Sequence, residues 1–228
     1  MGQKINTLLF RAQRRLSNVS NVSADATNLQ TSVWFANKRS YSKLVFQDKA
    51  IRDFLKKELA PAGVVEIIVR RYFRKVEVTI FVTKPGVVIG KGGSSINKLR
   101  EDLVTKFKLP MDLKLDIQEY KEPYRSAKIV AEEISEAIKR GISYRKLIKN
   151  YLEKIRYAGV LGTKITVSGR LNGAEIARAE NFALGSVPRH TIDSSIDYHN
   201  IHCLTKAGII GIKVWLYKGD KFKNYVGA

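Results

Sequence analysis

The sequence predicts an α+β protein of two domains, and three patterns support this prediction. Apolar and polar residues alternate over residues 76–82, as in a half-buried strand, and apolar residues then recur at helical spacing from Ile96 to Phe107. The second half of the chain contains two further amphipathic helices followed by a strand-rich region. With 228 residues and 44% apolar composition, the chain is long enough for two cores and too apolar for general disorder.

The first predicted domain covers residues 41–120 and follows a basic arm and loop of residues 1–40. Asp48 is a candidate N-cap for its first helix, and Ser94 or Ser95 for its second. The expected elements are helix, strand, strand, glycine loop, helix and strand, at residues 48–59, 64–70, 76–82, 90–93, 96–107 and 113–117. This order predicts a compact α+β unit in which one sheet covers the helices.

A glycine-rich turn, Gly90-Lys91-Gly92-Gly93, stands between the second of these strands and the second helix. Glycines let a phosphodiester backbone come close, and the N–H groups at the start of a helix attract phosphate. Spacing excludes a Walker A loop and a dinucleotide fingerprint, since three residues separate Gly86 from Gly90 and Ser95 stands where a third glycine is needed. An ordinary tight turn stays open for the tetrapeptide alone. With its flanking strand and helix, it predicts the loop of a type II KH domain, which clamps about four nucleotides.

The chain is strongly basic. Its 41 Lys and Arg residues against 21 acidic residues give a net charge of +20 and a pI near 10.0. This excess favours a polyanionic partner, because charge of either sign would serve solubility equally well. No apolar run approaches the roughly 18–20 residues of a membrane-spanning helix. Nucleic acid is therefore the expected partner, and a membrane is not.

Neither a metal nor another cofactor is predicted. Cys203 is the only cysteine, so an intramolecular disulfide is excluded and a reducing compartment is expected. His190, His199 and His202 lie near it in sequence, but no second cysteine pair or zinc-type spacing completes a metal site. A structural thiol is favoured over a nucleophile.

The second predicted domain covers residues 121–228 and has an α/β composition, with two helices and a mostly antiparallel sheet. Ser126 and Ser143 are the candidate helix caps. The helices are expected at residues 126–138 and 143–155, and strands at 164–167 and 209–217, with a glycine turn at 169–173.

Basic residues gather at several places that suit RNA phosphates. Arg145 and Lys149 lie along one side of the second helix of this domain, with Lys146 beside them, and only Glu153 offsets the positive run. A solvated helix face is the alternative for this strip. The first 24 residues contain no acid, which is typical of a transit peptide or of an RNA-binding arm. The further RNA-binding candidates are Lys4, Arg11, Arg14, Arg15, Arg156, Arg170, Arg178, Arg189 and His190.

Taken together, these residues resemble the bacterial-type family of small-subunit ribosomal protein S-three. The similarity follows the family in order along nearly the whole chain, so its specificity is high. The matching segments are Met1-Gly2-Gln3-Lys4, Trp34-Phe35-Ala36, Lys84-Pro85-Gly86-Val87-Val88-Ile89-Gly90-Lys91-Gly92-Gly93, Val167 to Ala179, Val187-Pro188, His190-Thr191, Ile196-Asp197-Tyr198 and Gly211-Ile212-Lys213-Val214-Trp215.

The resemblance implies a structural constituent of the small ribosomal subunit, not an enzyme, which binds small-subunit rRNA in the head beside neighbouring head proteins. It also implies contact with mRNA near the entry channel through basic residues on the helix after the KH domain. Those positions correspond to Arg145, Lys146 and Lys149. Lys146 takes a place usually held by Arg, which keeps the charge but not bidentate phosphate contact.

Two segments depart from the family pattern. Residues 5–12 replace its usual His-Pro-x-Gly-x-Arg-Leu-Gly stretch and lead into a longer loop before Trp34, and the long charged tail of many members is missing at Ala228. These departures favour an organellar ribosome in the mitochondrial matrix, with the bacterial cytoplasm as the alternative.

Two other functions stay open at this point. A free-standing KH-type regulator would bind RNA without joining ribosomes. A nucleic-acid lyase or nuclease would use Lys91 or a carboxylate with a metal, but the acidic residues do not cluster at ligand spacing. Asp193 and Asp197 are their nearest approach to a pair.

Overall fold

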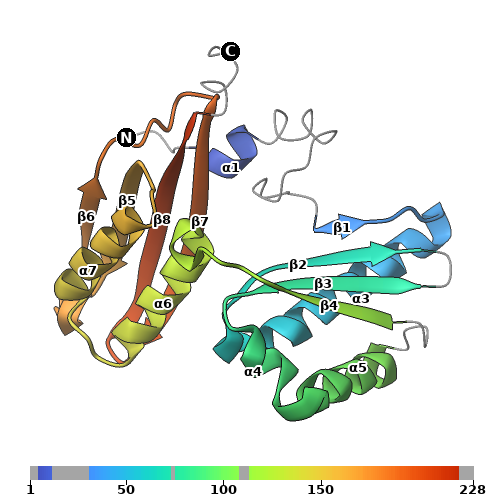
Figure 1. Cartoon of the computed structure of the whole chain (residues 1–228). Helices are drawn as coiled ribbons and strands as arrows, with labels where there is room; N and C mark the ends of the chain where they lie inside the picture. Colours follow the sequence, from blue (N-terminus) through green and yellow to red (C-terminus); the bar gives the residue numbers. More distant parts are fainter. Residues whose placement is uncertain (1–4, 12–30, 73–74, 108–112, 221–228) are drawn as a thin grey trace. The chain divides into compact units, whose positions relative to one another are not determined.

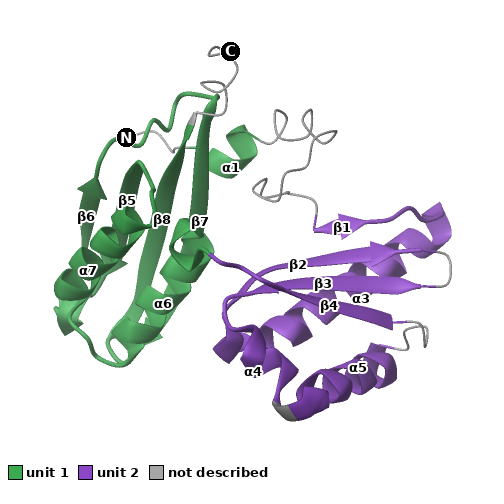
Figure 2. Cartoon of the chain, in the orientation of Figure 1, with its two compact units in different colours: residues 1–26, 122–228 green, residues 27–121 purple. Residues whose placement is uncertain are grey.

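The computed structural model describes residues 5–11, 31–72, 75–107 and 113–220. The chain forms two compact units, which have separate colours in Figure 2. The glycine-loop unit comprises residues 27–121, and the C-terminal unit comprises residues 122–228 together with residues 1–26. The residues expected to form one arm, 1–40, are therefore divided between the two units.

The glycine-loop unit has a four-stranded mixed sheet, and its core lies between one face of that sheet and three helices (Figure 1). Strands β2 and β3 are antiparallel, whereas β1 runs parallel to β2 and β4 runs parallel to β3. Ile51, Ile80, Val88 and Leu103 meet in the core. The elements are β1 (Ser32–Val33), α3 (Lys38–Glu58), β2 (Val64–Arg71), β3 (Val76–Val82), α4 (Pro85–Ile89), α5 (Ser94–Phe107) and β4 (Leu113–Glu119).

Helix α3 begins at Lys38, so the prediction of Asp48 as its N-cap is wrong. The first turns of α3 are largely exposed, and apolar spacing therefore gave no sign of them. Asp48 lies inside the helix with 1% of its surface exposed. It accepts hydrogen bonds of 2.7 Å from Trp34 Nε1 and from Arg71 Nε. A buried carboxylate is retained here because it is paired and hydrogen-bonded.

The C-terminal unit has a four-stranded sheet in the order β6-β5-β8-β7, in which every neighbouring pair is antiparallel. Helices α6 and α7 cover one face of this sheet (Figure 1). The elements are α1 (Thr7–Phe10), α6 (Ala127–Lys139), α7 (Tyr144–Tyr157), β5 (Gly162–Gly169), β6 (Arg178–Leu184), β7 (Ser194–Thr205) and β8 (Gly208–Asp220). The predicted α+β class, with two helices on a mostly antiparallel sheet in this half, is confirmed.

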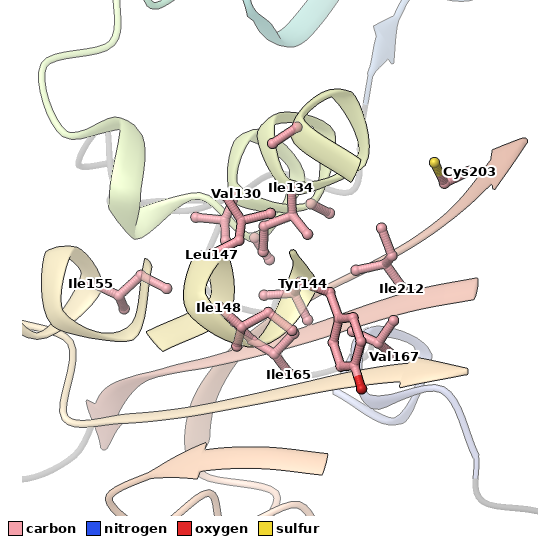
Figure 3. Close-up of a cluster of buried hydrophobic side chains, with 14 of the residues drawn as sticks. Val130, Ile134, Tyr144, Leu147, Ile148, Ile155, Ile165, Val167, Cys203 and Ile212 are labelled. Atoms are coloured by element: carbon pink, nitrogen blue, oxygen red, sulfur yellow. The ribbon is translucent and has the colours of Figure 1, made fainter. Parts of the chain in front are cut away.

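The core of this unit is shown in Figure 3, where Ile134 of α6 and Ile148 of α7 lie among the strand residues Ile165 and Ile212. Cys203 is fully buried in the same cluster, with its Sγ 3.4 Å from the carbonyl oxygen of Ser135. The thiol therefore has the structural setting that the sequence favours. None of the helices in the described residues is long and apolar enough to cross a membrane.

Helix α6 is capped from a distant part of the chain. Ser126 occupies the N-cap position, but its side chain makes no capping hydrogen bond. The Ala127 N–H instead donates to Asp197 Oδ2 at 2.9 Å, and Lys218 Nζ lies 3.7 Å from the same oxygen. Asp197, one member of the nearest acidic pair in the sequence, thus joins β7 to α6 and β8.

Candidate nucleic-acid interface

The glycine loop joins helix α4 to helix α5 through a backbone that only glycine adopts readily. Gly90, Gly92 and Gly93 have φ angles of 69°, 61° and 79°. A Cβ atom on Gly90 would also overlap the side chain of Ser95. The side chain of Lys91 lies outside the described part of the structure. The loop thus presents bare backbone at the start of a 14-residue helix, as phosphate binding requires.

A hollow elsewhere on the glycine-loop unit adds three cations that sequence reasoning missed. It lies between α5 and β4, has a volume of about 320 Å³, and is lined by Lys75, Arg100 and Lys114 over apolar residues that include Ile96 and Leu113. Lys114 is paired with Glu77 at 3.2 Å, so its charge is partly balanced. The three cations come from separate segments, and no local pattern in the sequence marks them. Three cations at one hollow suit contact with nucleic-acid phosphates.

The strip on helix α7 is exposed, as its sequence spacing predicts. Arg145, Lys146 and Lys149 face solvent, whereas Leu147 and Ile148 on the other side of the helix are buried in the core. Arg156 is exposed near the end of the same helix. Within the described parts of the chain, neither Lys146 nor Lys149 forms an ion pair. Their charges are therefore open to an external anion.

Arg145 differs from these lysines because a carboxylate on strand β6 holds it. Its Nη2 donates to Glu180 Oε1 at 2.7 Å and its Nε to Oε2 at 3.2 Å. The Tyr144 hydroxyl donates to the same carboxylate at 2.9 Å, and Arg178 Nε lies 3.3 Å away. The pKa of Glu180 lies below its ordinary value, mainly because of the hydrogen bonds from Arg145. Two predicted phosphate ligands, Arg145 and Arg178, thus meet at an acid that the sequence analysis did not single out.

Arg11 has a structural role, which corrects its prediction as an RNA ligand. Only 3% of its surface is exposed. Its guanidinium donates to the carbonyl oxygens of Thr7, Pro188 and Arg189 at 3.0, 3.2 and 3.1 Å. The buried cation therefore attaches helix α1 to the loop before β7, and no phosphate can reach it. Arg189 itself lies over the Trp215 ring, 5.6 Å from its centroid, and His190 next to it is exposed.

Arg170 is exposed but also holds two turns together. Its Nε donates to the Ala174 carbonyl oxygen at 2.9 Å, and its Nη1 donates to that of Ala207 at 3.1 Å. The first turn contains Asn172, which has a φ of 56°. Lys4, Arg14 and Arg15, the remaining candidates from the arm, lie outside the described residues.

This arrangement supplies charge and shape for binding. In the part of the chain that the structure describes, no group of three or more His, Cys, Asp or Glu side chains could hold a metal ion. The carboxylate of Asp197 is already used by the helix cap and Lys218. The geometry therefore suits binding of a polyanion by electrostatic contact and backbone approach.

Comparisons with known proteins agree with this geometry. The family model for the KH domain matches residues 50–125, and the model for the C-terminal domain of ribosomal protein S3 matches residues 134–216. Small ribosomal subunit protein uS3 of Roseobacter denitrificans is 38% identical over 96% of this chain and 88% of its own length. The uS3 protein of Methylacidiphilum infernorum is 35% identical over the full length of both chains. Protein uS3c of Guillardia theta is 35% identical over 99% of each. The chain belongs to the ribosomal protein S3 family.

Proposed function

We propose that this protein is a structural constituent of the small ribosomal subunit, where it binds rRNA and performs no catalysis. The observation that carries the proposal is the full-length similarity to small-subunit proteins, joined to a net charge of +20. The glycine loop and the exposed basic residues supply the RNA contacts. Gly90, Gly92 and Gly93 allow close approach of a phosphodiester backbone, and Arg156, Arg178 and His190 are exposed elsewhere as further contacts.

The finer part of the proposal concerns mRNA. The family resemblance implies that Arg145, Lys146 and Lys149 contact incoming mRNA near the entry channel, and their exposure on a helix whose other side is anchored in the core supports this proposal. A rigid helix holds the three charges at fixed spacing. The phosphates of an RNA strand can then contact several of these charges at once. The neighbouring proteins would be others of the subunit head.

Co-sedimentation tests the proposal. The tagged full-length chain, expressed in its host, should run with small subunits on a density gradient and stay with them after a wash at moderate salt. A chain that runs free of ribosomes while still binding RNA would overturn the proposal in favour of a free-standing regulator. RNA cleavage that depends on a metal and is lost in Asp197→Asn would overturn it in favour of an enzyme.

The compartment forms a separate proposal. The mitochondrial matrix is supported by the atypical residues 5–12 and the longer loop before Trp34. The relatives compared are mostly bacterial with one of plastid type, so they lend it no support. The bacterial cytoplasm stands beside it. Identifying the genome that encodes the chain, followed by fractionation of the host, decides between the two.

A further inference from the structure

A second groove in the C-terminal unit has no role in the function proposed above. It has a volume of about 730 Å³ and is formed by three turns: residues 139–144 between α6 and α7, residues 170–173 after β5, and residues 204–207 at the β7–β8 hairpin. Arg170 connects the second and third of these turns, since its Nη1 donates to the carbonyl oxygen of Ala207 at 3.1 Å. The groove is therefore held open by the fold itself and does not depend on a loose loop.

The rim of the groove is positive. Lys139, Arg140, Arg170 and Lys206 line it and are all exposed, and among the described residues that line it none is acidic. Arg140 has an ion pair of 3.5 Å with Glu136 in the preceding turn of α6, which is exposed and weak. Charge complementarity therefore requires an occupant with carboxylates or phosphates.

The apolar residues of the groove favour carboxylates of a protein over phosphates of RNA as the occupant's anions. Ile142 and Leu204 are 47% and 71% exposed, and Ile210, which also lines the groove, is buried. Many RNA-binding surfaces stack bases on exposed aromatic rings. Among the described residues that line this groove the only aromatic one is Tyr144, which is 3% exposed and donates a hydrogen bond to Glu180. An apolar centre inside a polar rim is the anatomy of a protein–protein contact.

We infer that this groove binds a peptide segment of a neighbouring small-subunit protein, one with an apolar side chain flanked by at least two carboxylates. The apolar side chain enters between Ile142 and Leu204, and the carboxylates face Lys139, Arg140 and Lys206. The inference rests on the proposed function, because the segment belongs to a protein that lies beside this chain in the same subunit.

Photo-crosslinking in assembled subunits tests the inference. p-Benzoylphenylalanine replaces Ile142 in the full-length chain, small subunits are isolated on a gradient and irradiated, and the crosslinked partner is identified by mass spectrometry. The expected partner is a protein segment with an apolar residue and at least two Asp or Glu within five positions. Leu204→Asp and Lys206→Glu should each lower the yield by about tenfold, since each removes one central contact.

Matched controls come from the same unit. Leu161→Asp changes an aliphatic residue that is 63% exposed at the opposite end of β5, and Lys213→Glu reverses an exposed charge on β8 outside the groove. Both should leave the yield within twofold of the parent. Circular dichroism of the variants, all altered at exposed positions, checks their folding.

Three results would overturn the inference while the proposed function stands: a crosslink to rRNA, a crosslink to a segment without carboxylates, or a yield that Leu204→Asp and Lys206→Glu do not change. In each case the chain still sediments with small subunits. A parent chain absent from small subunits would refute the proposed function, and the inference with it.

Discussion

In each unit of this protein a carboxylate accepts hydrogen bonds from an arginine and from an aromatic side chain. The two carboxylates differ in burial. In the glycine-loop unit, Asp48 is 1% exposed, and the side chain of its partner Arg71 is 10% exposed. In the C-terminal unit, the side chain of Glu180 is 21% exposed and that of Arg145 is 60% exposed. The same chemistry is therefore sealed from water in one unit and open to it in the other.

This difference in burial predicts different roles for the two carboxylates. Removing one partner of a buried pair leaves an uncompensated charge in a medium of low dielectric, at a cost of several kcal/mol. An exposed ion pair is screened by water and salt. Its loss therefore changes the local electrostatic potential more than the free energy of unfolding. We therefore expect Asp48 to affect folding and Glu180 to affect the affinity of the α7 strip for RNA.

The largest effect is expected from a substitution that removes Asp48 from its buried hydrogen bonds and ion pair. Asp48→Ala should lower the free energy of unfolding of the glycine-loop unit by about 3–5 kcal/mol, because Arg71 stays buried without its partner. Urea unfolding followed by Trp34 fluorescence, in a Trp215→Phe background, measures it. Glu101→Ala removes an exposed acid from α5 of the same unit and should cost no more than about 0.5 kcal/mol. Equal losses in both variants would contradict the structural role of Asp48.

The next effect concerns backbone geometry in the same unit. Gly90→Ala should destabilise the loop by about 1–3 kcal/mol, since φ is 69° with ψ near 180° and the new Cβ overlaps Ser95. Gly86→Ala is the matched control, because its Cβ meets open space and the residue lies in a helix. Hydrogen exchange of the α5 amides reports the change. Unchanged protection in Gly90→Ala would show that the loop tolerates a side chain.

The exposed strip should affect RNA binding and leave stability unchanged. Replacing Arg145, Lys146 and Lys149 by Ala should reduce the slope of log affinity against log salt for single-stranded RNA by about 2, at roughly 0.7 for each contact. Translation through structured mRNA should slow, while small-subunit assembly stays intact. The control replaces three exposed lysines of α3, Lys43, Lys49 and Lys57. Failed assembly with normal translation through structure would show that the strip binds rRNA instead.

A smaller effect sharpens the contrast between the two carboxylates. Glu180→Gln removes the charge that holds Arg145 but keeps its shape and hydrogen-bonding oxygen, so RNA affinity at low salt should rise by about two- to threefold. Glu153→Gln changes the net charge of the same surface equally without touching Arg145, and should have the smaller effect. Filter binding to a short RNA measures both. Equal gains would mean that Glu180 acts only through net charge.

The smallest effect is the dependence on pH. Because Arg145 holds the pKa of Glu180 below its ordinary value, the carboxylate should stay ionised as the pH falls from 7 to 5. A carboxylate whose pKa is lowered by folding stabilises the folded state at pH values above its unfolded pKa, near 4.3. This stabilisation is lost only as the pH falls through the lower pKa of the folded state. The ratio of RNA affinities between the native chain and Glu180→Gln should therefore be constant from pH 7 to 5. If the RNA affinities of the native chain and Glu180→Gln became equal at a pH above 5, the prediction of a constant ratio would be contradicted.

Much of the fold follows from local patterns. Alternation over residues 76–82 predicted β3, and helical spacing from Ile96 to Phe107 predicted α5, because each pattern lies within one element and reflects which side faces the core. The glycine loop was found in the same way, since its unusual φ angles require glycine wherever the loop stands. The polyanion partner followed from net charge alone.

What only the tertiary structure decided concerns charged residues whose partners are far away in sequence. Asp48 and Arg71 are 23 residues apart, Arg145 and Glu180 are 35 apart, and Arg11 and Pro188 are 177 apart. A charged side chain looks the same in the sequence whether it faces water or a partner. Its role is set by burial and by the groups around it, and these exist only once distant segments have packed together. For this reason the sequence determined the class, the glycine loop and the basic character of the protein, while the fold decided which cations remain open to RNA.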